Sequence, residues 1–297
     1  MPRLSRNTVV VGNSLVCCGG RCVLGPDRKN LFFSTLLILV PVIVYCTTVA
    51  TILGVATIVL GAVFGAASFF AMYATALTDP GIVLKEDGSS GVDPPITVRD
   101  HGLQDGTIVR VKWCHTCKIF RPPRCSHCRV CNNCIEKFDH HCPYIGQCIG
   151  IRNYRYFLSF ISLTSMLCML VFVTSLVVIV RIIKKASEEG NSYWDTLGDQ
   201  IAAIILVLIS FIFLWFLGGL TLFHVYLQCK GRTTNENTKR PYGNDNPYDK
   251  GCLGNFQEIW CASTPASHLT SLLHSYPDIQ ESLPPESVIS PQGIMMR

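Results

Sequence analysis

Cysteine and histidine residues concentrate in one short window of this chain, and their spacing is that of metal ligands. Half of the sixteen cysteines in the 297 residues lie between Cys114 and Cys148, together with several histidines. Thiolates and imidazoles at such short separations are the usual ligands of zinc in proteins. The window therefore predicts a module that is organised by metal ions.

The window contains more donor side chains than two tetrahedral zinc sites need. Two Cys-x2-Cys pairs would each seed one site, and they are Cys114/Cys117 and Cys128/Cys131. Both sites would be completed by Cys134, Cys148 and two of the histidines His115, His127, His140 and His141. The spacing alone leaves open which histidines bind, and whether Cys125 or Cys142 is the thiol left over. A closed zinc site has no open position for a substrate, so the leftover thiol is the candidate for chemistry.

Long stretches without Asp, Glu, Lys or Arg flank this window, and each is long enough to cross a membrane. They are residues 31–78, 156–180 and 200–229. A helix needs about 20 apolar residues to cross a bilayer, and the first stretch has room for two crossings. We therefore expect transmembrane helices over residues 31–50, 53–77, 156–180 and 201–226. Buried helices of a soluble fold are disfavoured, because charge-free runs of this length are rare there.

The distribution of basic residues orients the expected spans. Four spans place both termini and the cysteine window on one side, and the first span lacks the features of a cleaved signal peptide. The N-terminal segment alone contributes Arg3, Arg6, Arg21, Arg28 and Lys29, whereas the loop between the first two spans has no basic residue. The positive-inside rule then predicts cytosolic termini and a cytosolic cysteine window. The cytosol is reducing, which favours metal ligands over disulfides.

The predicted fold is thus an α-helical membrane protein with four transmembrane helices and a cytosolic zinc-binding cysteine-rich domain between helices 2 and 3. The formal charge of +5 is modest, and the chain has no basic stripe or nucleic-acid motif. We attribute this charge to anionic lipid at the bilayer surface, and we expect no nucleic-acid partner.

The window contains the run Cys114-x2-Cys117-x3-Arg121-Pro122-x-Arg124-x2-His127-Cys128-x2-Cys131-x2-Cys134-x4-Asp139-His140-His141-Cys142-Pro143. This run resembles the cysteine-rich domain of DHHC-type protein S-acyltransferases. Outside it, Asp79-Pro80-Gly81 resembles the DPG motif of the family, Thr233-Thr234-Asn235-Glu236 its TTxE motif, and residues 246–260 its C-terminal segment. Gly146-Gln147-Cys148 is more similar to the plant branch. Two positions depart from the family, because Tyr144 stands where Trp is usual and Gln147 where many members have Asn.

The resemblance implies roles for individual residues. One Cys3His zinc site would use Cys114, Cys117, His127 and Cys134, and the other Cys128, Cys131, His141 and Cys148. Cys142 would be the acyl-accepting nucleophile, His140 its general base, and Asp139 the group that orients His140. Thr234 would lie near Asp139. No position of a cofactor-binding residue is implied.

The implied chemistry suits these residue types. A thiolate attacks a thioester far faster than a thiol does, an imidazole can take the thiol proton, and a carboxylate can fix the imidazole tautomer. The resemblance implies two structural Zn2+ ions and palmitoyl-CoA as the acyl donor. It also implies substrates with cytosolic juxtamembrane cysteines, and residence in an endomembrane such as the Golgi, the endoplasmic reticulum or the plasma membrane. Small residues such as Gly54, Gly61 and Gly65 would make room for the acyl chain. The Gly61-x3-Gly65 spacing also predicts close packing of helices within the bundle.

The expected domain organisation follows the spans and motifs. It comprises a cytosolic leader (1–30), helices 1 and 2 (31–78), the DHHC domain (79–155), helix 3 (156–180), a lumenal or extracellular loop (181–199), helix 4 (200–227), a TTxE and docking segment (228–261) and a disordered tail (262–297). The sequence leaves open whether Cys17, Cys18, Cys229 or Cys261 are themselves acylated.

Two rivals to the enzyme use the same residues. One is a membrane-anchored zinc adaptor of the RING or another interaction-finger type, and the other is a catalytically silent scaffold of the same family. A RING requires a different ligand order and has no use for an unligated cysteine beside two histidines. The intact Asp139-His140-His141-Cys142 run argues against the scaffold.

Overall fold

The computed structural model describes residues 8–270, except 19, 86–92, 104, 191, 193–197, 199 and 244. This part of the chain divides into two compact units. A cysteine-rich unit comprises residues up to 31, 74–155 and from 227 onward, and a helical unit comprises residues 32–73 and 156–226. Each unit is described by itself below.

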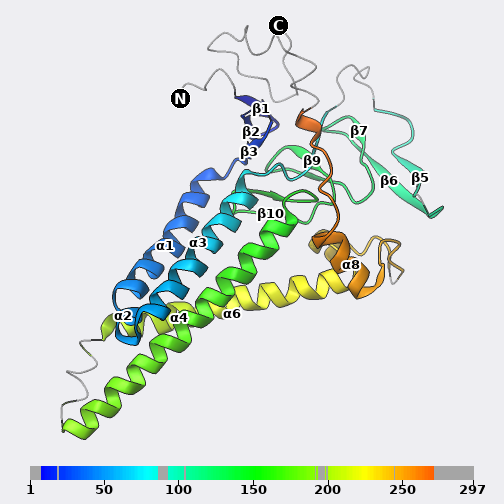
Figure 1. Ribbon diagram of the computed structural model, residues 1–297. Helices are drawn as coiled ribbons and strands as arrows, with labels where there is room; N and C mark the ends of the chain where they lie inside the picture. Colours follow the sequence, from blue (N-terminus) through cyan, green and yellow to red (C-terminus); the bar gives the residue numbers. More distant parts are fainter. Residues whose placement is uncertain are drawn as a thin grey trace. The chain divides into compact units, whose positions relative to one another are not determined.

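The helical unit contains the apolar helices. Its helices are α1 (Arg28–Thr47), α2 (Val49–Leu53), α3 (Val55–Leu77), α4 (Tyr154–Glu189) and α6 (Ile201–Cys229). Within the described part of the chain, four helical segments are long and apolar enough to cross a membrane, and α1 and α2 together form one of them. Figure 1 shows these segments, with α4 as the long green helix. The predicted fold class, with four spans and a cysteine-rich domain between the second and third, is confirmed.

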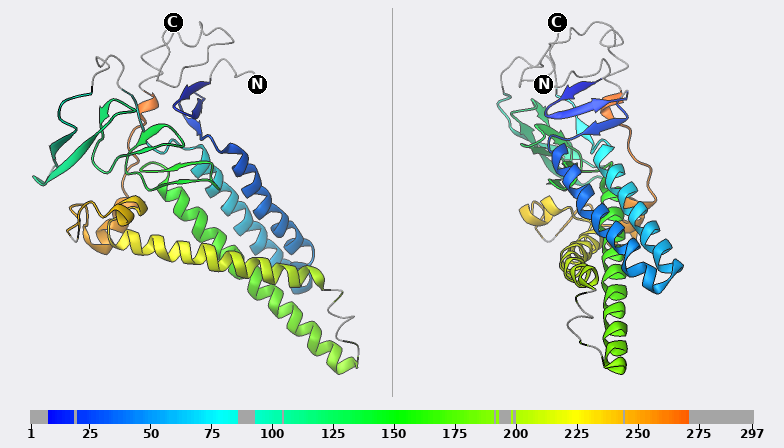
Figure 2. Two further views of the ribbon diagram at one scale, coloured as in Figure 1. Left: turned by 180° about the vertical axis from the view of Figure 1, so that it is seen from behind. Right: turned by 90° about the vertical axis from the view of Figure 1, so that its left-hand side faces the viewer.

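Helix packing in this unit depends on glycine. α1 and α3 run side by side in both Figure 1 and Figure 2. A Cβ atom at Gly61 of α3 would lie 2.6 Å from the ring of Tyr45, and one at Gly65 would lie 3.1 Å from Val42. The two helices approach too closely there for any side chain. Gly61 and Gly65 therefore serve the packing of α1 against α3, as their spacing predicts.

Two helix ends differ from the predicted spans. Gly54 adopts φ 110° and ψ 176° between α2 and α3, a conformation that only glycine tolerates easily. α4 continues beyond Val180 to Glu189, because the charged residues that follow are good helix formers and Lys185 pairs with Glu189 at 3.8 Å. Part of the predicted loop 181–199 is thus helical, and residues 193–197 lie outside the described residues.

The cysteine-rich unit is built from short antiparallel strands. They form the sheets β1-β2-β3 (Val9–Val11, Ser14–Cys17, Cys22–Leu24), β4-β9-β8 (Ile82–Val83, Asn133–Ile135, Ser126–Cys128), β5-β6-β7 (Val98–Gly102, Ile108–Cys114, Ile119–Phe120) and β10-β11 (His140–Cys142, Gln147–Ile149). The helices α7 (Thr234–Lys239) and α8 (Gly251–Trp260) complete the unit. Strands of two to seven residues cannot form a large apolar core, so other interactions must hold them.

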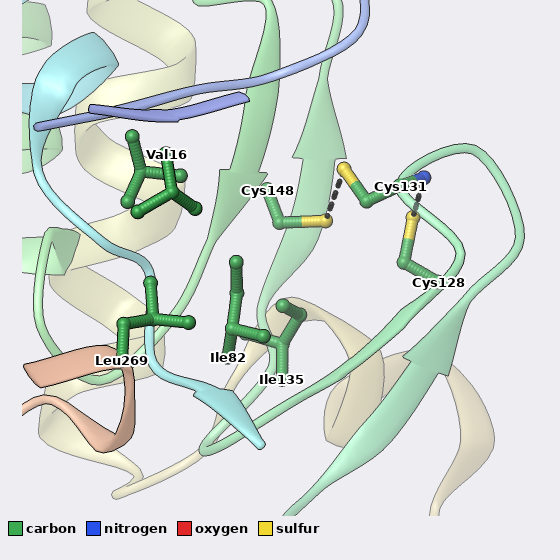
Figure 3. Packing of buried hydrophobic residues seen from close by; sticks show 8 residues of the cluster. Val16, Ile82, Cys128, Cys131, Ile135, Cys148 and Leu269 are labelled. Carbon is green, nitrogen blue, oxygen red and sulfur yellow. Dashed lines mark hydrogen bonds between the residues drawn. The ribbon is translucent and has the colours of Figure 1, made fainter. Parts of the chain in front are cut away.

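A small apolar cluster lies beside the cysteines of this unit. Figure 3 shows Val16, Ile82, Ile135 and Leu269 packed near Cys128, Cys131 and Cys148. Leu269 belongs to the segment 262–297, for which we predicted disorder, yet it is only 1% exposed. Residues 271–297 of that segment lie outside the described residues, as do residues 1–7 of the leader.

Candidate active site and metal centres

The first predicted donor set comes from the strands β6, β8 and β9 and from the turn that follows β6. Cys114, Cys117, His127 and Cys134 place their ligand atoms within 4.8 Å of one another. The Nδ1 atom of His127 is 3.3 Å from the Cys117 sulfur and 3.9 Å from the Cys134 sulfur. The pairing of β8 with β9 sets His127 opposite Cys134, and the turn between β6 and β7 brings in the two other thiols.

The second predicted donor set is assembled in the same way. Cys128, Cys131, His141 and Cys148 also place their ligand atoms within 4.8 Å of one another. His141 Nδ1 faces all three sulfurs, at 3.4 Å from Cys131, 3.6 Å from Cys148 and 3.8 Å from Cys128. The β10-β11 hairpin sets His141 opposite Cys148.

The chemistry of both donor sets fits zinc. Each offers three thiols and one imidazole, which is a common donor combination for a structural tetrahedral zinc ion. All six thiols are buried, so their partners are each other and the histidines rather than water. Cys128 and Cys131 also form the tight turn expected of a Cys-x2-Cys ligand pair, in which the Cys131 backbone N–H donates to the Cys128 sulfur at 3.4 Å.

Cys142 is the thiol that the DHHC run leaves outside both donor sets. It lies on β10 directly after His141 and is 8% exposed. His140, two residues earlier on the same strand, pairs through Nδ1 with Asp139 Oδ2 at 2.6 Å. Burial acts to lower the pKa of His140, but hydrogen bonds with Asp139 and Cys142 outweigh it and raise this pKa to about 9. The three side chains form a thiol–imidazole–carboxylate array.

The TTxE motif holds the carboxylate of this array in place. Asp139 is 1% exposed, and it accepts hydrogen bonds from the Thr234 backbone N–H and the Thr234 hydroxyl, both at 2.8 Å. The Asn235 backbone N–H donates to the Asp139 carbonyl at 3.1 Å. The predicted proximity of Thr234 and Asp139 is therefore present in the structure.

A buried ion pair anchors the same motif, and neither partner was assigned a role in the sequence analysis. Arg124 donates to both carboxylate oxygens of Glu236, at 2.7 and 2.6 Å, and the two side chains are 9% and 4% exposed. Glu236 also closes a capping box with Thr233 at the start of α7. The Arg124 guanidinium lies 4.6 Å from the centre of the Tyr248 ring. Arg124 and Glu236 each stand in a recognised motif, but nothing local indicates that they pair.

The DPG motif forms a turn that is tied to the rest of the unit. Asp79 is 2% exposed and accepts from the backbone N–H groups of Gly81 and Ile82, both at 2.9 Å. Its other carboxylate oxygen accepts from Ser267 at 2.5 Å and lies 3.3 Å from Arg152 Nε. The turn therefore depends on the Asp79 carboxylate, which belongs to neither of the two Cys3His donor sets.

The two departures from the family pattern have different surroundings. Gln147 reaches the carbonyl oxygens of Thr75 and Thr78, at 2.7 and 3.1 Å, so its longer side chain ties β11 to the last turn of α3. Tyr144, by contrast, is 57% exposed.

The other histidine and cysteine residues considered in the sequence analysis belong neither to the Cys142–His140–Asp139 array nor to the two donor sets. His115 is exposed and pairs with Asp93 at 2.7 Å, so it is not a member of either donor set. Cys125 packs against the first set. Cys229, for which the sequence left acylation open, forms a disulfide with Cys252. Cys18 and Cys261 are exposed.

Comparisons with known proteins agree with the arrangement. A family model for DHHC palmitoyltransferases matches residues 108–241, which include both donor sets and the TTxE motif. Protein S-acyltransferase 8 of Arabidopsis thaliana is 37% identical over 86% of this chain and 69% of its own length. The probable protein S-acyltransferases 7 and 6 of the same plant are 37% and 39% identical, over 93% and 86% of this chain and 67% of their own lengths.

Proposed function

Because this chain belongs to the DHHC palmitoyltransferase family and is a protein S-acyltransferase, we propose that Cys142 carries the acyl group from fatty acyl-CoA to the protein substrate. The observation that supports this assignment is a buried thiol outside both donor sets, next to an imidazole that is itself held by Asp139 at 2.6 Å. The RING-type zinc adaptor that we considered as a rival is set aside, because this chain belongs to the DHHC palmitoyltransferase family.

The first half-reaction charges the enzyme. His140 takes the proton of Cys142, and the thiolate sulfur attacks the carbonyl carbon of the acyl-CoA thioester. The bond from that carbon to the CoA sulfur breaks as the new thioester forms, and the CoA thiolate leaves with the proton that His140 took from Cys142, so His140 is neutral again. Asp139 pairs with His140 Nδ1 at 2.6 Å, and this contact fixes the orientation of the imidazole ring beside Cys142.

The second half-reaction transfers the acyl group. A cysteine thiol of the substrate loses its proton to His140 and attacks the acyl-Cys142 carbonyl carbon. Cys142 leaves as a thiolate and recovers a proton from His140, so the enzyme returns to its starting state. No net oxidation or hydrolysis is involved.

The two donor sets would each hold one structural zinc ion. Bound zinc would supply a fixed frame for the short strands, with four protein ligands and no open position for a substrate. Within that frame, a zinc-bound His141 would hold β10 in place, and Cys142 lies on the same strand. The residues that we assign as ligands are Cys114, Cys117, His127 and Cys134 for one ion, and Cys128, Cys131, His141 and Cys148 for the other.

The protein is a multi-pass membrane protein, and this location suits the reaction. A fatty acyl chain partitions into the bilayer, with about 0.8 kcal/mol gained for each buried CH2 group, so donor and lipidated product both concentrate there. We propose palmitoyl-CoA as the donor and substrates with cytosolic juxtamembrane cysteines. We also propose cytosolic termini and residence in the Golgi, the endoplasmic reticulum or the plasma membrane.

Autoacylation of the purified full-length protein tests the assignment. Incubation with radiolabelled palmitoyl-CoA should give a hydroxylamine-labile acyl group, and Cys142→Ser should abolish it without changing the zinc content. Cys125→Ser is the matched control, because Cys125 is the other thiol of the window outside both donor sets. Undiminished autoacylation of Cys142→Ser, or its loss in Cys125→Ser alone, would refute the assignment.

A further inference from the structure

Asp27 lies against the second donor set, far from it in sequence and outside the residues that the family model matches. We propose that Asp27 is a positioning residue for His141 and, through His141, for the strand that bears Cys142. Its Oδ2 atom is 2.8 Å from His141 Nε2, while His141 Nδ1 faces the three sulfurs of that set. The consequence for Cys142 rests on the function proposed above.

The contact has a defined chemical role. An imidazole that binds a metal through Nδ1 carries its proton on Nε2, and a carboxylate that accepts this proton fixes both the tautomer and the ring plane. It also increases the electron density at the ligating nitrogen. Such carboxylate–histidine–metal arrangements typically change metal affinity or activity by about 10–100-fold when the carboxylate is removed.

The backbone holds Asp27 at this position. The Asp27 backbone N–H donates to the Gly146 carbonyl at 3.2 Å, in the turn that joins β10 to β11. A Cβ atom on Gly25 would overlap that same carbonyl, and one on Gly146 would lie 3.0 Å from the Asp27 carbonyl oxygen. Such a close approach is possible only for glycine at both positions, and Gly146 also adopts φ +84°. The segment therefore contacts the β10-β11 hairpin at its turn and at His141.

The N-terminal sheet provides a second, independent attachment to the same region. The Asn13 side chain donates to the Val130 carbonyl at 2.8 Å, and the Asn133 side chain donates to the Val11 carbonyl at 2.9 Å. These contacts reach residues on either side of Cys131 in the second donor set, but none of the ligand side chains. Asn13 thus offers a matched control, which separates docking of the leader from the effect of the Asp27 carboxylate.

Zinc release from the purified full-length protein measures the role of Asp27 without relying on activity. Wild-type protein, Asp27→Leu, Asp27→Asn and Asn13→Ala would be mixed with a chromophoric chelator, and the release of each zinc ion followed by absorbance. Asp27→Leu should accelerate one of two release phases by roughly 10-fold or more and leave the other unchanged. Asp27→Asn keeps an acceptor oxygen but loses the charge, so its acceleration should be smaller. Asn13→Ala should release both ions at the wild-type rate.

The autoacylation rate should fall in the same order, from wild type through Asp27→Asn to Asp27→Leu. Wild-type release rates in the Asp27 variants would overturn the inference, and so would equal acceleration of both phases or an equal effect of Asn13→Ala. If Asp27→Leu does not fold, Asp27→Asn decides alone, since an unchanged release rate would then refute the role. Autoacylation that persists in Cys142→Ser would refute the proposed nucleophile instead and leave the difference in zinc release intact.

Discussion

In the cysteine-rich unit, clustered thiols and buried charged side chains connect short strands, whereas the helical unit packs around an apolar cluster. One apolar cluster of the helical unit includes Tyr45, Leu167 and Val171. Several polar side chains of this unit bond within their own helix, as the Thr164 hydroxyl does to the Phe160 carbonyl. In the cysteine-rich unit, Asp139, Glu236 and Asn255 are each at most 3% exposed and bond to distant segments.

This difference follows from the different structural requirements of the two units. Helices in a bilayer satisfy their backbone hydrogen bonds internally, so apolar side chains and close packing suffice. The cysteine-rich unit has to place an imidazole and a thiol accurately without a large core. Metal ligation and satisfied polar networks supply that accuracy, because each interaction has a defined direction and distance.

The largest expected effect is the loss of a metal ligand from the cysteine-rich unit. Cys128→Ala should lose zinc and misfold that unit, because metal binding provides about 10–16 kcal/mol in small structural zinc modules. The helical unit should keep its helical content, since it has no ligand in either donor set. Metal analysis, limited proteolysis and circular dichroism would measure the three outcomes.

Wild-type protein should contain two zinc ions per chain in the same metal analysis. A count near one, or a normally folded Cys128→Ala protein, would contradict the interleaved ligand scheme. Cys168→Ala, which removes a thiol from α4, is the control that should leave zinc content unchanged.

Removal of the proposed base, His140, should slow the reaction without unfolding the cysteine-rich unit. His140→Ala should keep both zinc ions and slow autoacylation at neutral pH by about 10²–10⁴-fold, the usual contribution of a general base. Raising the pH should restore part of the rate, because hydroxide can then generate the thiolate. Loss of a zinc ion in His140→Ala would instead identify this residue as a ligand.

Breaking the buried pair of Arg124 and Glu236 should be the next largest effect. Arg124→Met leaves a buried carboxylate without its partner and should lower the free energy of unfolding by about 3–5 kcal/mol. The double change Arg124→Met/Glu236→Met should recover part of that loss. Thermal denaturation would measure both, with Arg110→Met as the control, because Arg110 is exposed on β6. A destabilisation no greater than that of Arg110→Met would contradict the importance of the pair.

The smallest effect tests packing in the helical unit. Gly61→Leu should force α1 and α3 apart and destabilise the protein by about 1–3 kcal/mol, because Tyr45 already occupies the space. Gly219→Leu is the matched control, since a Cβ atom there meets nothing within 4 Å. Zinc content and the autoacylation chemistry should be retained in both variants. Equal melting temperatures for the two would show that the close helix approach does not contribute.

Several features follow from the sequence alone, because they depend on residues that are near one another along the chain. The spacing from Cys114 to Cys148 was sufficient to predict two metal sites, whereas the full membership of the two donor sets that the structure brings together came only from the family resemblance. The absence of charge over long stretches was sufficient to predict four spans, since crossing a bilayer is a requirement of length and composition. The sequence even identified Thr234 as a neighbour of Asp139, but only through the family resemblance.

Other features were decided by the tertiary structure, because they join residues more than a hundred positions apart. The pairs Asp27–His141 and Arg124–Glu236 have no local signal, since any carboxylate can meet any cation or imidazole once the chain folds. Gly61 illustrates the same limit, because its sequence spacing indicated close packing but not that Tyr45 would fill the space beside it. Spacing along the chain thus determined which groups are available for metal binding and chemistry. Which distant carboxylate or ring lies against each of them was fixed only by the folded backbone.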